Sequence, residues 1–114
     1  MTLEQLSPTS VESTPDRDRR TAHLEDAGPL LDVLSSQTAR EILDVVRESP
    51  ATPSDIADEL DVSLQAVTYH LSRLQGVDLL TPVSVKYSQK GREMNVYDLS
   101  AESVTVSFAE PPKW

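Results

Sequence analysis

The strongest constraint on the fold is the stretch 52–80, in which apolar residues recur at helical spacing in two short runs. The first run contains Ile56, Ala57 and Leu60, and the second contains Val67, Leu71 and Leu74. Residues three, four and seven positions apart lie on one side of an α-helix, so each run predicts an amphipathic helix with one buried face. Because little sequence separates the runs, the two helices are expected to pack against each other.

Residues suited to helix capping mark where these two helices begin. Thr52 and Ser63 each precede a helical run, and their hydroxyl groups can accept hydrogen bonds from the N–H groups of the first turn. Pro53 suits the first helical position, where its missing N–H costs nothing. Asp55 adds negative charge close to the helix N-terminus, where it is favourable.

The turn between the helices consists of Asp61 and Val62. A helix-turn-helix needs a small residue where the helices cross, a turn residue that tolerates positive φ, and an apolar residue beneath the turn. Ala57, Asp61 and Val62 fit these roles in that order, although glycine would adopt the left-handed conformation at lower cost than Asp61. The stretch is therefore predicted to be a helix-turn-helix.

Two further helices are expected before this motif. Residues 29–35 begin with Pro29 and are almost all apolar, so this helix must be covered on more than one side. Residues 38–47 are expected to form the next helix, with Thr38 and Glu41 as a capping box. Its predicted buried residues are Ala39, Ile42, Leu43 and Val46. Pro50 ends this helix, because proline disfavours helical conformation in the preceding residue.

The pattern changes to period two after residue 80, which predicts β-strands. One strand contains Val83, Val85 and Tyr87, residues 89–92 form the turn, and the return strand contains Met94, Val96, Tyr97 and Leu99. This hairpin, residues 83–99, is a candidate wing. Val104, Val106 and Phe108 alternate with polar residues and predict a last short strand; a helix is the alternative, although Val-Thr-Val forms helices poorly.

The predicted fold class is mainly α with a small β-hairpin, a three- to four-helix bundle plus a wing. We expect a disordered tail over residues 1–27, a winged helix-turn-helix domain over 28–109, and a frayed end over 110–114. The tail contains the charged run from Asp16 to Arg20, which could reach into a minor groove as a basic arm. The favoured interpretation of this run is a solvated tail.

Composition excludes several classes of site. The chain has no cysteine, so it contains no disulfide or thiolate metal site, and its two histidines, His23 and His70, lie far apart in sequence. No phosphate-binding loop, nucleophile motif or metal-ligand spacing is present, so we expect neither an enzyme nor a bound cofactor or metal. No apolar run is long enough for a membrane span or secretory signal, which predicts a cytoplasmic protein.

Charge is distributed unevenly along the chain, whose formal net charge is −9. Residues 24–61 carry ten acidic and two basic side chains, a net charge of −8, whereas residues 62–92 carry one acidic and four basic side chains, a net charge of +3. The second segment is the one expected to meet phosphates, so this asymmetry favours nucleic-acid binding. At molar salt the Debye length is about 3 Å, so acidic groups away from the contact surface barely repel DNA. An acidic DNA-binding protein therefore suits a cytoplasm at molar salt, and we expect a halophilic host.

The second helix and the strand after it resemble the ArsR-type winged-helix repressors of archaea and bacteria. The matching residues are Ser63, Val67, Thr68, His70, Leu71 and Leu74, followed by Leu79 and Leu80, within a resemblance that covers about residues 30–99. The acidic composition is similar to that of a haloarchaeal version. The resemblance implies a homodimer with one helix in the major groove and the wing over the adjacent backbone. Two departures are Asp78, where the family has glycine, and the missing cysteine and histidine ligands of its metal-sensing branch.

Candidate DNA-binding residues lie on the face of the second helix opposite its leucines and on the wing. They are Ser63, Gln65, Thr68, Tyr69, Ser72, Arg73, Lys86, Lys90 and Arg92. Gln65 can bond to adenine, Thr68 can contact a base or a thymine methyl group, and Arg73 can bind guanine or phosphate. The alternative is a plain polar surface, and for the wing a solubilising hairpin tip.

The function expected from these observations is sequence-specific binding of double-stranded DNA by a transcription regulator. Helix 63–75 would read the major groove and the wing 83–99 would contact the backbone. A domain of this size is marginally stable alone, so we expect a homodimer. Its interface would use the first helix and the last strand, through Leu30, Leu31, Val33, Leu34 and the segment from Val104 to Phe108. The alternative is a winged-helix module that binds another protein and does not bind DNA.

Overall fold

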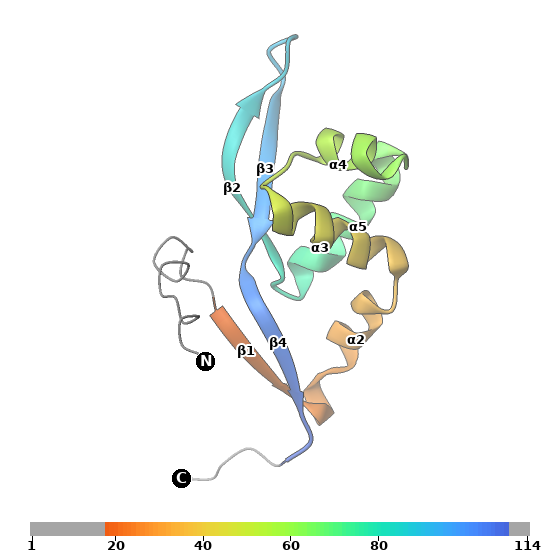
Figure 1. The fold of residues 1–114 in the computed structure, drawn as a ribbon, viewed down its shortest axis with the longest axis vertical. Coiled ribbons are helices and arrows are strands. Elements are labelled where there is room, and N and C mark those ends of the chain that lie inside the picture. The colour runs from red at the N-terminus through yellow and green to blue at the C-terminus, as the bar shows by residue number, and fades with distance from the viewer. Residues whose placement is uncertain (1–17, 110–114) are drawn as a thin grey trace, which may run out of the picture.

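The computed structural model describes residues 18–109. Its elements, in chain order, are β1 (Asp18–His23), the 3-10 helix η2 (Leu24–Asp26), α2 (Gly28–Leu34), α3 (Gln37–Glu48), α4 (Pro53–Leu60), α5 (Leu64–Gly76), β2 (Leu80–Tyr87), β3 (Glu93–Leu99) and β4 (Ala101–Ser107). Four α-helices lie on one side of the molecule and the strands on the other (Figure 1). The four expected helices, the hairpin and the last strand are all present, and the alternative of a helix over residues 101–108 is wrong.

The core forms where α3, α4 and α5 pack together beside the base of the hairpin. Most apolar positions predicted from helical spacing are inside: Ile56, Val67 and Leu74 are fully buried and Leu71 is nearly so. Leu43 and Leu60, predicted on the same faces, are only partly buried. The cap of α4 is as predicted, because the Asp55 N–H donates to Thr52 Oγ1 at 3.1 Å and the Thr52 N–H donates back to Asp55 Oδ2 at 3.2 Å. This reciprocal capping box fixes the start of the helix-turn-helix.

The start of α3 differs from the sequence prediction. Its N-cap is Ser36, whose Oγ accepts a hydrogen bond from the Ala39 N–H at 3.2 Å, so the capping box predicted for Thr38 and Glu41 is wrong. Glu41 instead accepts from the side chain of Gln37 at 2.9 Å. Ser36 and Thr38 are both suitable cap residues. The short connection after α2 leaves Ser36 in the extended conformation that a cap requires, and α3 begins two residues earlier than expected.

The wing is the antiparallel pair β2–β3, and it is fastened to the helices at its base. Ala51, just before α4, forms an isolated bridge to Tyr97 on β3, with two backbone hydrogen bonds of 3.1 and 2.8 Å. At the tip, Gly91 has a φ of 79°, and Ser88 Oγ accepts from the N–H groups of Lys90 and Arg92. The hairpin is thus ordered at its turn and held against the motif at its base.

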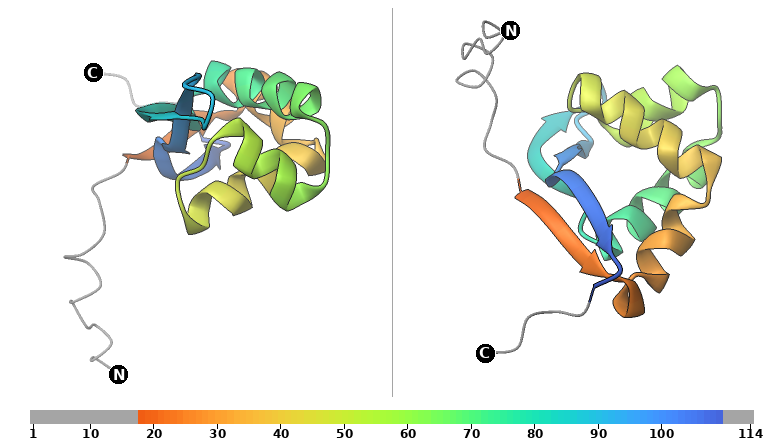
Figure 2. Two further views of the ribbon diagram at one scale, coloured as in Figure 1. Left: turned by 90° about the horizontal axis from the view of Figure 1, so that it is seen from above. Right: turned by 60° about the horizontal axis from the view of Figure 1, so that its bottom comes forward.

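Residues 18–26 are structured, which corrects the prediction of a disordered tail that continues to residue 27. β1 pairs in parallel with β4 from Asp18 opposite Ala101 to His23 opposite Ser107, and the two strands lie side by side in Figures 1 and 2. The predictions of disorder for residues 1–17 and of fraying for residues 110–114 fall outside the described part of the chain. The strand β1 has few apolar residues, so its sequence does not predict a strand. Its backbone is extended because it pairs with the edge of β4.

The two arginines of the Asp16 to Arg20 run that the structure describes belong to β1, so the interpretation of this run as a solvated tail is wrong for them. Arg19 pairs with Glu102 of β4 at 3.3 Å. Arg20 donates to the backbone carbonyl oxygens of Asp78 and Ser100, the latter at 3.3 Å. Asp78 directly follows the C-cap of α5, and its φ is 61°. Arg20 therefore binds the strand pair to the C-terminal end of α5, where a positive charge is favoured.

Candidate nucleic-acid interface

The turn between α4 and α5 has the conformation that the sequence predicts. Asp61 is left-handed, with φ 57° and ψ 48°, and the N–H of Val62 donates to the carbonyl oxygen of Ala57 at 3.2 Å. Ser63 caps α5, because its Oγ accepts from the Ala66 N–H at 3.0 Å. This turn sets the angle at which α5 leaves the core and therefore determines which of its faces is exposed.

The exposed face of α5 carries the side chains that the sequence singled out. Gln65, Thr68, Tyr69 and Ser72 are exposed, and Tyr69 retains 58% of its accessible surface. The Thr68 hydroxyl donates to the carbonyl oxygen of Gln65 at 3.0 Å, which leaves its oxygen lone pairs and its methyl group available to a partner. The helix contains no acidic residue, so this face differs sharply from α3 and α4.

Arg73 lies at the far end of this face and already has a partner. Its Nη2 is 3.0 Å from Oδ2 of Asp32 in α2, and its side chain keeps only 31% of its accessible surface. The Arg73 guanidinium carbon lies 5.8 Å from the centroid of the Tyr69 ring, and the Tyr69 and His70 rings are nearly perpendicular, with their centroids 5.0 Å apart. Arg73 is thus held between α2 and Tyr69, a restraint that sequence spacing did not predict.

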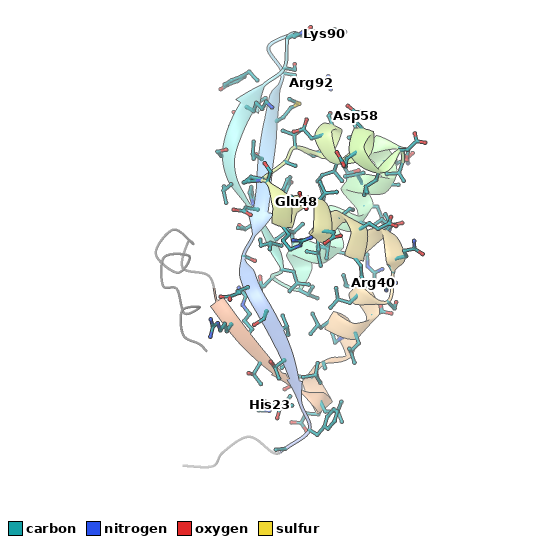
Figure 3. The ribbon with its side chains drawn as sticks, viewed as in Figure 1. His23, Arg40, Glu48, Asp58, Lys90 and Arg92 are labelled. Atoms are coloured by element: carbon teal, nitrogen blue, oxygen red, sulfur yellow. The ribbon has the colours of Figure 1, made fainter. Side chains whose placement is uncertain are left out.

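Two of the three basic residues of the wing lie at its tip, and the third lies nearer the helices. Lys90 and Arg92 lie at the free end of the hairpin and are exposed (Figure 3). Lys86 is also exposed, but its charge acts on Asp55 of α4. The pKa of Asp55 is lowered below its ordinary value of 3.8, chiefly because the carboxylate accepts the Thr52 backbone N–H, with smaller contributions from the Thr52 side chain and Lys86. The structure therefore places Lys90 and Arg92 together, and Lys86 closer to the helices.

Two residues near α5 were missed by sequence reasoning. Leu64, in the first turn of α5, keeps half of its surface exposed next to the polar face. The sequence carried no signal of this exposure, because Leu64 lies three residues before Val67 and seven before Leu71, at the spacing of the buried stripe. Asp32 had no signal either, because it approaches Arg73 across 41 residues of sequence.

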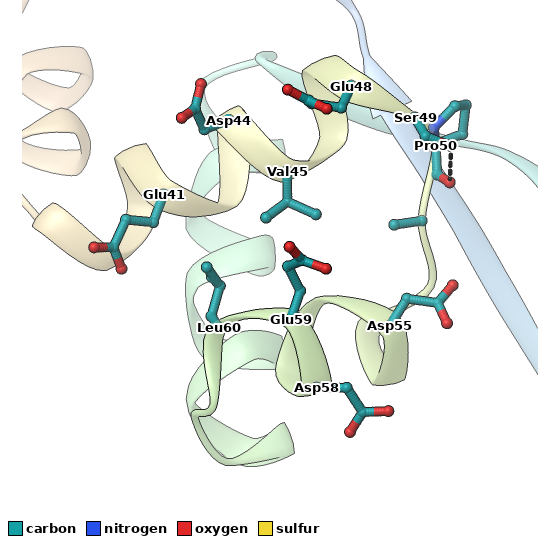
Figure 4. A pocket seen from close by; sticks show the side chains of 11 residues that line it. Glu41, Asp44, Val45, Glu48, Ser49, Pro50, Asp55, Asp58, Glu59 and Leu60 are labelled. Carbon is teal, nitrogen blue, oxygen red and sulfur yellow. Dashed lines mark hydrogen bonds between the residues drawn. The ribbon is translucent and has the colours of Figure 1, made fainter.

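The acidic side of the molecule is a separate surface. A cleft of about 860 Å³ separates α3 from α4 and is lined by carboxylates from both helices, as Figure 4 shows. These are Glu41, Asp44, Glu48, Asp55, Asp58 and Glu59. Within residues 18–109, no group of three or more acidic, histidine or cysteine side chains is arranged to hold a metal ion. No helix of that region is long and apolar enough to cross a bilayer.

Comparison with protein families and solved structures agrees with this architecture. A family model described as a helix-turn-helix domain matches residues 34–83. An ArsR-like transcriptional regulator from Rhodococcus sp. RHA1 is 34% identical over 62% of this chain and 61% of that chain, with a TM-score of 0.52. A search of curated proteins found no match.

Two more distant structures cover more of the chain. Reduced HlyU from Vibrio cholerae N16961 has a TM-score of 0.55 at 19% identity and covers 88% of this chain and 84% of its own. NolR from Sinorhizobium fredii has a TM-score of 0.52 at 16% identity and covers 90% of this chain and 81% of its own. At these identities the likeness concerns the fold alone. The family model matches residues 34–83, and the structure has four α-helices and a wing held against them at its base. This chain therefore has the winged helix-turn-helix fold.

Proposed function

We propose that this chain is a transcription regulator that binds double-stranded DNA, with α5 in the major groove and the wing over the adjacent backbone. The observation that carries the proposal is the exposed, acid-free face of α5 in a molecule whose other helices are acidic. The helix-turn-helix match and the 34% identity to an ArsR-like transcriptional regulator support it. A fold of this kind gives no support to an enzymatic role.

Each exposed side chain of α5 has a contact suited to its chemistry. Gln65 presents an amide that can pair with both hydrogen-bonding groups of adenine in the major groove. Thr68 offers a methyl group to thymine, because its hydroxyl hydrogen is already used within the helix. Tyr69 is the most exposed of the large hydrophobic side chains on the helix. Ser63 and Ser72 suit phosphate oxygens, and Ser63 lies beside the free N–H groups at the start of α5.

The wing contributes contacts to the backbone in this proposal. Lys90 and Arg92 lie at its tip, where two cations close together can span neighbouring phosphates. Lys86 has a weaker role, because part of its field is directed at Asp55. The affinity is therefore expected to decrease steeply with salt, and each lost phosphate contact would lower the slope of log affinity against log salt by about 0.9.

Replacing Tyr69 and Arg73 together with alanine tests this function. The double variant should lose at least about tenfold in affinity for duplex DNA, because it loses a base-side contact and a cation from the same row. The measurement is a gel shift in high KCl with duplexes selected from a randomised pool by the wild-type chain. Arg47→Ala is the matched control, since it removes an exposed arginine from α3. Equal binding by all three proteins would contradict the proposal.

We also propose that the regulator acts as a homodimer. Of the four apolar residues of α2, Leu30 and Val33 are buried within the single chain, whereas Leu31 keeps 49% of its surface exposed. Leu24 in η2 and Phe108 after β4 are exposed by 52% and 82%, and the pairing of His23 with Ser107 brings them close together. This end of the molecule exposes apolar surface that a second copy would cover.

Leu31→Glu tests the dimer. The variant should be a monomer at concentrations where the wild-type chain is a dimer, because a charge in an apolar interface is costly to bury. Sedimentation equilibrium in molar KCl measures the mass of both proteins. Leu64→Glu, a similar exchange on the exposed face of α5, should leave the mass unchanged. A monomeric wild-type chain would rule the dimer out.

The alternative function is a module that binds a protein and no DNA. The acidic cleft between α3 and α4 favours it, because six carboxylates there would attract a basic segment. The gel shift separates the two functions. A protein-binding module would not enrich any duplex from the randomised pool, and its Tyr69 and Arg73 variant would be no weaker than the wild type.

A further inference from the structure

The contact between Arg73 and Asp32 occupies a side chain that DNA binding requires. Arg73 follows Gln65 and Tyr69 in one row along α5, at intervals of four residues. In the free chain its Nη2 lies 3.0 Å from the Asp32 carboxylate. Carboxylate and phosphate oxygens bind the same donors of a guanidinium group. A phosphate that approaches Arg73 therefore meets a group with part of its binding capacity already used.

Asp32 brings a negative charge to a face that otherwise lacks one. α5 contains no acidic residue, and Asp32 reaches it from α2 with 74% of its side chain exposed. Such an exposed pair contributes little to stability, because solvent screens it and both side chains must be ordered. The pair therefore has a small role in the fold, whereas it occupies a guanidinium group that an approaching phosphate would otherwise bind.

We infer that Asp32 is an intramolecular competitor of DNA for Arg73 and lowers the affinity of the regulator. This inference rests on the proposed DNA-binding function. Asp32 neutralises the guanidinium charge in the free chain, so Arg73 releases fewer counterions from DNA than an unpaired arginine would. It also links the strength of binding to the position of α2. Because α2 carries Leu31 toward the proposed dimer face, a displacement of this helix would free or restrain Arg73.

Asp32→Asn removes the charge while it retains the size of the side chain. We expect this variant to bind duplex DNA about threefold more tightly or better at low salt, and to gain about 0.9 in the slope of log affinity against log salt. When KCl is raised from about 0.2 to about 0.8 M, this steeper slope means that Asp32→Asn loses about 3.5-fold more affinity than the wild type. The measurement is fluorescence anisotropy with a labelled duplex enriched from the randomised pool, and with a scrambled duplex of the same composition.

Asp44→Asn is the matched control. Asp44 also pairs with an arginine, at 2.8 Å from Nη2 of Arg47, and is similarly exposed, but it lies on α3. Both variants change the net charge equally, so an effect of total charge would appear in both. Arg73→Gln completes the comparison, because Asp32→Asn should have no effect in a chain that lacks the Arg73 guanidinium.

The outcomes separate the inference from the function beneath it. Tighter binding by Asp32→Asn that disappears in the Arg73→Gln background supports competition. Equal gains for Asp32→Asn and Asp44→Asn, or a gain that survives Arg73→Gln, overturn it in favour of net charge. Weaker binding by Asp32→Asn also overturns it, because Asp32 would then position Arg73 for DNA. No duplex bound by the wild type overturns the proposed function itself.

Discussion

At the scale of single residues, the helix-turn-helix depends on polar groups that replace missing backbone hydrogen bonds. Thr52 is almost completely buried, and its hydroxyl and N–H both bond to Asp55. Each bond satisfies a group that the first turn of α4 leaves without a helical partner. Asp61 and Asp78 adopt positive φ where glycine would be less strained. The motif is thus specified by a few local hydrogen bonds as well as by its apolar stripe.

Asp55 makes the stability of the motif depend on pH. Its pKa is lowered in the folded chain, mainly by the hydrogen bond from the Thr52 N–H, relative to the ordinary value of 3.8. The stabilisation by the carboxylate is therefore present above about pH 4 and is lost as the pH falls through the lowered folded pKa. Asp55→Ala should lower the free energy of unfolding by about 0.5–1 kcal/mol at neutral pH, because the exposed charge is partly screened.

Urea denaturation at about pH 7 and pH 2 measures this difference. The difference in free energy of unfolding between Asp55→Ala and the wild type should narrow at the lower pH, since falling pH favours protonation of the wild-type carboxylate. Asp58→Ala is the control, because Asp58 is exposed on the same helix outside the capping box. A gap that stays constant with pH would show that the charge of Asp55 contributes nothing.

At the scale of elements, the strand pair β1–β4 is coupled to the end of α5 by Arg20. Arg20→Ala should lower the free energy of unfolding by about 1–3 kcal/mol, because hydrogen bonds from a charged donor to the carbonyl oxygens of Asp78 and Ser100 are lost. Arg19→Ala should cost about 0–1 kcal/mol, because its pair with Glu102 is exposed. Chemical denaturation of both variants provides the comparison, and equal losses would contradict the coupling.

The elements that the sequence predicts are those whose patterns are local. Spacing of apolar residues and capping side chains located α4 and α5, and alternation located the wing and β4. The strand β1 has no comparable pattern, and its only reason to be extended is a partner far along the chain: Arg19 and Glu102 are 83 residues apart. The contact of Asp32 with Arg73 was hidden for the same reason. Of the candidate site, the exposed residues were predictable, and their intramolecular partners were not.

At the scale of the whole molecule, the net charge of −9 sets how stability responds to salt. The carboxylates around the cleft between α3 and α4 repel one another at low ionic strength. Added KCl should raise the midpoint of thermal unfolding, because the Debye length falls from about 10 Å at 0.1 M to about 3 Å at 1 M. This response would support the proposal of a host with molar internal salt.

Circular dichroism during heating at several KCl concentrations measures the midpoint. A variant with Asp44→Asn, Glu48→Gln and Asp58→Asn should gain less from salt, because three charges of the cleft are absent. Arg40→Gln and Arg47→Gln, which make α3 more acidic, should gain more. A midpoint that falls with KCl in the wild type would contradict this account.

The parallel pairing of β1 with β4 has a consequence for synthesis on the ribosome. β1 emerges before the helices, and its partner strand emerges only after the wing. Until then the nascent polypeptide can fold α3, α4 and α5, but Arg20 lacks the Ser100 carbonyl that helps to hold it against the end of α5. A product of premature termination within the wing would therefore carry α5 without its brace, and would be a substrate for proteases.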